Sequence, residues 1–202
     1  TLPTNLGEGF VILAAVALGA VLPILPVQIL WINMTTVGVL GLVLALENKE
    51  PGIMRRPPRD PEAPILTDVL LWRIAIVGLL ILLGAFGLFW WEQRNGASLA
   101  QARTVAVNVV VMVEVFYLFN CRSLTHSMFH IGLFSNPWLG FGVLGMALLQ
   151  LAFTYLPWMN AVLSSAPIGL DAWGRILGVA VFGYLLVELE KWLRRRRATH
   201  RL

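Results

Sequence analysis

Long apolar stretches, separated by short polar or proline-containing segments, dominate the chain. We predict six of them, at about residues 1–21, 27–46, 67–92, 98–120, 137–155 and 171–191. Most of these stretches approach the roughly 20 residues that a helix needs to cross a bilayer. The alternation of polar and apolar residues that is typical of a membrane β-strand is missing. The pattern therefore predicts an all-α fold, a polytopic membrane bundle of six transmembrane helices.

Proline and capping residues indicate where the helices begin and end. A turn at Pro23 and Pro26 is expected to end the first helix, and four prolines within 57–64 exclude a helix from the long polar connector. Thr67 and Ser98 precede apolar stretches, and both residue types favour the N-cap position. We therefore predict that these two residues cap the third and fourth helices.

Composition supports a membrane protein. The chain is 58% hydrophobic and 13% charged, whereas soluble domains are nearer to one quarter charged. With Cys121 as the one cysteine, no internal disulfide can form. The chain begins without Met and without a basic leader, so its first stretch does not have the pattern of a signal peptide. We expect the chain to be a piece of a longer protein.

The basic residues predict the orientation of the bundle. An even number of spans puts both termini on one side, and of the 15 Lys and Arg residues only Arg94, Arg103 and Arg175 fall on the other. The positive-inside rule makes the basic side, with both termini, cytoplasmic. We place the chain in a bacterial plasma membrane. The basic tail 194–197 is expected either to bind anionic lipid head groups or to serve only as a stop-transfer anchor.

Two acidic residues, Glu8 and Glu114, lie deep inside apolar stretches. An acid within a membrane is costly and points to a functional site. Asn5 shares a helix face with Glu8, and Asn33 shares one with Thr36. Carboxylates, amides and hydroxyls together resemble the oxygen-rich set that hard cations prefer. The alternative is that the amides and hydroxyls only bond neighbouring helices.

The spacing around the first turn argues against a simple pairing of these residues. Asn33 lies about as far after the turn as Val16 lies before it. The pattern therefore predicts that Asn33 and Glu8 lie at different depths along the two helix axes, unless a helix breaks or slides. Gly38 and Gly41 are expected to loosen the second helix there.

Three further polar residues lie within apolar stretches. Gln150 and Thr154 share one face of the fifth stretch and are expected to bond neighbouring helices. Asn108, in the fourth stretch, is expected either to do the same or to act as a ligand.

Several stretches resemble the P-type cation-transporting ATPases, most of all the calcium-pump-like branch. They are Thr-Asn-Leu-Gly-Glu-Gly at 4–9, the segment 25–36, the connector 51–59, Glu114 followed by 119–124, and Leu-Asp at 170–171. The resemblance covers essentially the whole chain. It implies that the chain is the carboxy-terminal membrane region of such a pump, its fifth through tenth helices.

The resemblance implies an ion-binding role for five residues. Asn5 and Glu8 match fifth-helix ligands, Asn33 and Thr36 match sixth-helix ligands, and Glu114 matches an eighth-helix ligand. The transported cation would be calcium or another cation, and we expect protons to replace it on the carboxylates when it leaves. The family usually has an Asp directly after that Thr, where this chain has Val37. Two calcium sites of the usual kind are therefore not expected.

Other parts of such a pump are not in this sequence. It contains no Asp-Lys-Thr-Gly phosphorylation motif and no Pro-Glu-Gly-Leu-Pro ligand segment. ATP and Mg²⁺ would therefore bind only in the parent pump. The expected partners are the lipid bilayer and the remaining helices and cytoplasmic domains of that pump, with no nucleic acid. The alternatives are a free-standing membrane scaffold or regulatory fragment without transport activity and, more weakly, a passive channel.

Overall fold

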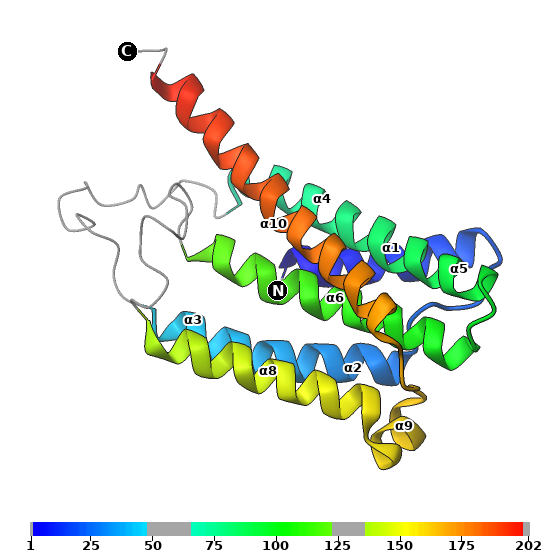
Figure 1. Ribbon diagram of the computed structural model, residues 1–202. Coiled ribbons are helices and arrows are strands. Elements are labelled where there is room, and N and C mark those ends of the chain that lie inside the picture. The colour runs from blue at the N-terminus through cyan, green and yellow to red at the C-terminus, as the bar shows by residue number, and fades with distance from the viewer. Residues whose placement is uncertain (1, 48–65, 123–135, 200–202) are drawn as a thin grey trace.

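The computed structural model describes residues 2–47, 66–122 and 136–199, and within these ranges it contains helices and no strand (Figure 1). The elements are α1 (Leu2–Ala17), α2 (Pro26–Thr35), the π-helix η1 (Thr36–Gly41), α3 (Leu42–Ala45), α4 (Asp68–Ile81), the π-helix η3 (Leu82–Phe86), α5 (Gly87–Arg94), α6 (Leu99–Cys121), α8 (Pro137–Tyr155), α9 (Pro157–Leu163) and α10 (Leu170–Thr199). The connector 51–59, one of the stretches that carry the family resemblance, lies outside the described residues.

Five helices in the described ranges are long and apolar enough to cross a membrane. They are Pro26–Ala45, Asp68–Arg94, Leu99–Cys121, Pro137–Tyr155 and Leu170–Arg196. The all-α prediction is confirmed for the part of the chain that the structure describes. The helix α1 is apolar but has only 16 residues. The count of six spans and the side of the termini therefore stay predictions.

Both predicted N-caps are confirmed. The Thr67 hydroxyl accepts a hydrogen bond from the Leu70 amide at 3.4 Å. The Ser98 hydroxyl accepts one from the Gln101 amide at 3.2 Å, and the Gln101 side chain accepts one in return from the Ser98 amide at 2.9 Å. This reciprocal capping box satisfies amides that have no partner within the helix.

Two helix ends and one additional helix differ from the sequence-based expectation. The first helix ends at Ala17 rather than near residue 21, and Gly19 follows with a positive φ of 60°. The short helix α9 was not predicted, and it begins at Pro157, because proline suits the first helical position. The last helix runs on to Thr199, eight residues past the expected end. Basic side chains near a helix C-terminus interact favourably with the helix dipole there.

The helix α6 lies at the centre of the bundle. In Figure 1 it runs between the pair α4 and α10 on one side and the pair α2 and α8 on the other. Its most apolar window is 83% buried, whereas the windows of the other four candidate spans are 28–33% buried. A helix that is apolar all round belongs in the core, and the outer helices present their remaining apolar faces to lipid.

The helices α8 and α3 approach each other closely at Gly142. A Cβ atom added there would overlap Cγ2 of Val43. We predict that Gly142→Ala lowers the free energy of unfolding of the full-length protein by about 1–3 kcal/mol, as overpacking of a core does. The measurement is the thermal midpoint in detergent. Gly140→Ala on the same helix is the control, because no atom of the described residues lies within 4 Å of its added Cβ. An equal loss in both variants would contradict the prediction.

Candidate functional site

Two carboxylates from different helices lie inside the bundle. Glu8 on α1 is 4% exposed and Glu114 on α6 is 7% exposed. The two carboxylates lie near each other, because Thr4, one helical turn before Glu8 on α1, donates a hydrogen bond to Glu114. Burying one such group is costly without a partner, and burying two of them near each other is more so. The arrangement therefore needs compensation by hydrogen bonds, by protons or by a bound cation.

Glu8 receives one hydrogen bond from the second helix. Its Oε2 atom accepts from the Asn33 side-chain amide at 3.1 Å, and the same amide donates to the Ile29 carbonyl at 3.1 Å. The other carboxylate oxygen, Oε1, is buried and has no hydrogen-bond partner among the described residues. One oxygen of Glu8 is thus held in place while the other remains available for a ligand.

Glu114 has the same division between its two oxygens. Its Oε1 atom accepts from the Thr4 hydroxyl at 3.0 Å. Its Oε2 atom is buried and has no hydrogen-bond partner within the described ranges. Thr36 lies near this carboxylate, although its hydroxyl donates to the Ile32 carbonyl at 2.9 Å. Buried polar atoms without partners are rare in native proteins and call for a ligand, an ion or a role.

The predicted offset between Glu8 and Asn33 is absent. Glu8 lies nine residues before Ala17, the end of α1, and Asn33 lies seven residues after Pro26, the start of α2. At about 1.5 Å per residue the two distances are about 13 Å and about 10 Å, so the two side chains lie at similar depth. The expectation was wrong because it continued the first helix to about residue 21.

The second helix changes its geometry at the site. The π-helix η1 begins at Thr36 and continues to Gly41. Val37 and Gly38 are both exposed, and neither Gly38 nor Gly41 has an atom within 4 Å of an added Cβ. The loosening that the two glycines predicted thus takes the form of a π-helical segment. Such segments occur often at functional sites.

The structure brings together four of the five residues that the sequence predicts. Glu8, Asn33, Thr36 and Glu114 lie at one place between α1, α2 and α6. Asn5 is exposed on α1 and makes no hydrogen bond to the described residues. Sequence reasoning missed Thr4, although it lies four residues before Glu8 and therefore on the same face of the helix.

The site is rich in oxygen, and among the described residues it has no imidazole or thiolate ligand of the kind that transition metals prefer. Within the described residues, no group of three or more His, Cys, Asp or Glu side chains forms. Two carboxylates with hydroxyl and amide oxygens close by suit a hard cation that is carried through the site as cargo.

The fold and the site together define a class, the polytopic helical membrane proteins with ionisable groups inside the bundle, as in ion transporters. Residues 21–193 match the family described as "Cation transporting ATPase, C-terminus", and the chain belongs to this family. It is therefore an integral membrane protein, and the predicted resemblance to the carboxy-terminal region of P-type ATPases is confirmed.

Several relatives are similar over most of this chain. It is 56% identical to the probable cation-transporting ATPase F of Mycobacterium tuberculosis, and the match covers 98% of this chain and 22% of that protein. It is 38% identical to the cation-transporting ATPase pma1 of Synechocystis over 85% of its length, 20% of that protein. It is 32% identical to a calcium-transporting ATPase of Bacillus subtilis over 92% of its length, 21% of that protein. The chain thus spans about a fifth of the length of these relatives.

Proposed function

We propose that the chain is the membrane-transport portion of an ATP-driven cation pump and supplies part of its intramembrane cation site. The observation that carries this proposal is the pair of buried carboxylates, Glu8 and Glu114, each with one oxygen that lacks a partner among the described residues. A cation between α1 and α6 would be ligated by these two oxygens and would neutralise both charges. This is the compensation that two buried acids need.

The second helix supplies the neutral part of the site. Asn33 and Thr36 lie next to the carboxylates, and the Asn33 side chain already holds Glu8. Asn5 stays a proposed ligand on the strength of the family resemblance. Asn5 is exposed on α1, and we propose that other helices of the complete pump cover this face.

The proposed cargo is calcium or another cation, bound one ion at a time. Two carboxylates balance one divalent ion, and affinity for divalent cations depends on the number of charged ligands. Val37 stands where the resemblance predicts a third carboxylate, and it is 49% exposed. The relative from Bacillus subtilis is named a calcium-transporting ATPase, which supports calcium as the first cation to test.

The two carboxylates also suggest what happens when the cation leaves. Two like charges at this proximity in a low-dielectric interior repel each other, and a buried acid without a counter-ion takes up a proton instead. We therefore propose proton countertransport. ATP and Mg²⁺ would bind in other parts of the complete pump, in a bacterial plasma membrane with both termini of this chain on the cytoplasmic side.

The deciding experiment measures ATP hydrolysis and ion uptake by the full-length protein in liposomes, with Ca²⁺, Mn²⁺, Na⁺ and K⁺ each added alone after chelation. We expect one of these cations to stimulate hydrolysis and to accumulate in the vesicles. If none of these cations stimulated ATP hydrolysis, the result would favour the alternative of a membrane scaffold. Conductance by the chain without ATP would favour the passive channel.

A further inference from the structure

A second group of buried polar side chains links α2 to α6 through α8. The Trp31 indole nitrogen donates to Gln150 Oε1 at 3.2 Å, and Gln150 Nε2 donates to Asn108 Oδ1 at 3.2 Å. The Asn108 amide donates in turn to the Thr154 hydroxyl at 3.1 Å and to the Thr104 carbonyl at 2.9 Å. We call Trp31, Gln150 and Asn108 the amide bridge. It confirms the expectation that Gln150 and Thr154 bond neighbouring helices.

Only one orientation of the two amide groups in the bridge satisfies all of its hydrogen-bond donors and acceptors. Gln150 and Asn108 are fully buried, and in each of them the amide oxygen accepts while the amide nitrogen donates. The Trp31 ring also stacks on Phe153 of α8, with 6.1 Å between the ring centroids. Rotating the Gln150 amide by half a turn would set its nitrogen against the Trp31 donor and its oxygen against the Asn108 acceptor. The bridge therefore holds its three helices at fixed heights.

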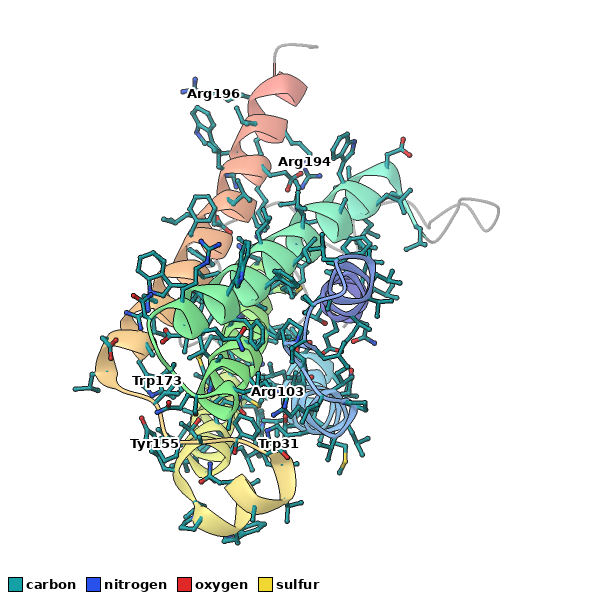
Figure 2. All side chains as sticks on the ribbon, turned by 90° about the vertical axis from the view of Figure 1, so that its right-hand side faces the viewer. Trp31, Arg103, Tyr155, Trp173, Arg194 and Arg196 are labelled. Atoms are coloured by element: carbon teal, nitrogen blue, oxygen red, sulfur yellow. The ribbon has the colours of Figure 1, made fainter. Side chains whose placement is uncertain are left out.

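The bridge and the cation site lie on the same pair of parallel segments. Both α2 and α6 run away from the end of the bundle where α9 lies (Figure 1). Figure 2 shows Trp31 toward that end, together with Tyr155 and Trp173, and far from Arg194 and Arg196. Trp31 precedes Thr36 by five residues and Asn108 precedes Glu114 by six. At about 1.5 Å per residue, these spacings are about 8 Å and about 9 Å.

Because these two distances along the helix axes nearly match, the position of α2 relative to α6 at the bridge also sets the position of Thr36 relative to Glu114. If α2 slid by one residue along α6, Thr36 would move by about 1.5 Å relative to Glu114, and Asn33 would move equally relative to Glu8. Ligand geometry is sensitive to displacements of that size. The π-helix η1 lies directly beyond Trp31 and Asn33, and a Cβ added at Gly38 or Gly41 would meet no atom within 4 Å among the described residues, so these two glycines add no contact that would hold the register.

We propose that Gln150 is a positioning residue for the cation site, acting through Trp31 to fix α2 against α6. This inference rests on the proposed function. Gln150 does not contact the cation. It keeps Asn33 and Thr36 at the depth of the two carboxylates, so that the free oxygens from α1 and α6 and the neutral oxygens from α2 and η1 converge on one ion.

The test is Gln150→Leu in the full-length pump, reconstituted in liposomes with the cation that stimulates it. We expect the cation concentration for half-maximal ATP hydrolysis to rise about tenfold, with the rate at saturating cation changed less than twofold, because the ligands remain and only their placement is lost. Thr154→Val is the matched control. It removes a hydrogen bond from Asn108 but leaves the link from Trp31 to Asn108 intact, so its half-maximal concentration should stay within twofold.

A second variant guards against misfolding. Trp31→Phe keeps a ring to stack on Phe153 and removes the indole donor, and it should raise the half-maximal concentration as Gln150→Leu does. The double variant should be no worse than the worse single one, since both break the same link. Unchanged cation dependence in Trp31→Phe, or an equal shift in Thr154→Val, would overturn the proposal. If Glu8→Gln and Glu114→Gln also left cation dependence intact, the proposed function itself would fail.

Discussion

If the full-length protein is the proposed pump, Glu8→Gln should raise the cation concentration for half-maximal ATP hydrolysis at least about 100-fold. Substituting a residue that only supports a metal ligand lowers metal affinity by about 10–100-fold. Glu8 is proposed to bind the ion directly, so its substitution should have a larger effect. Glutamine keeps the size of the side chain and can still accept from Asn33, so the loss would come from the charge and from the second carboxylate oxygen. The measurement is ATP hydrolysis as a function of cation concentration.

Glu114→Gln should act in the same direction and for the same reason. Its amide oxygen can still accept from the Thr4 hydroxyl, so the local structure should persist. Asp68→Asn provides a control for loss of one negative charge, because Asp68 is exposed at the start of α4. Its cation dependence should match that of the unmodified pump. Normal cation dependence in both glutamate variants would remove the ligand assignment.

Arg122→Met should destabilise the protein by about 3–5 kcal/mol, as removal of one partner from a buried ion pair does. The Arg122 guanidinium donates to Glu47 Oε1 at 2.9 Å, and the side chains are 0% and 13% exposed respectively. Asn136 donates to the other oxygen of Glu47 at 2.9 Å. This ion pair ties the ends of α3 and α6 to the start of α8. Without Arg122 a nearly buried carboxylate loses its counter-charge. The measurement is the thermal midpoint of the detergent-solubilised protein.

Two further variants separate the ion pair from a general effect of mutation. The double variant Glu47→Gln/Arg122→Met removes both charges of the pair and should recover part of the lost stability. Asp171→Asn breaks a pair whose acid is 73% exposed, and exposed pairs contribute about 0–1 kcal/mol. If the double variant were as unstable as Arg122→Met alone, the unpaired charge of Glu47 would not be the cause.

Much of the fold could be predicted because helix signals are local. The N-caps at Thr67 and Ser98 lie next to the helices that they begin, and the apolar stretch predicted at 137–155 coincides with α8. The helix end at Ala17 was missed because the residues after it are still apolar. Its local signal was Gly19, since glycine just past a helix end adopts the positive φ found there. The π-helix at Thr36 could not be predicted, because glycines indicate loosening but not its geometry.

The two acidic residues of the candidate site could be predicted from the sequence, whereas the contacts that they make could not. Glu8 and Glu114 stand out because a carboxylate in an apolar stretch is rare whatever surrounds it. The contact of Thr4 with Glu114 joins residues 110 positions apart, and that of Gln150 with Trp31 joins residues 119 apart. No pattern along one helix specifies such pairs.

The amino-acid sequence by itself determined that this chain is a helical membrane protein with two costly acids inside it, since hydropathy and local capping depend only on neighbouring residues. The tertiary structure alone decided that α6 is the central helix, that Glu8 meets Asn33, and that Gln150 links Trp31 to Asn108. The physical reason is that hydropathy does not mark the buried helix: α6 has a mean hydropathy of 1.8, within the range of 1.5 to 2.5 of the other candidate spans. Which of the spans is buried, and at what height, depends on close packing and on buried hydrogen bonds between segments distant in the chain.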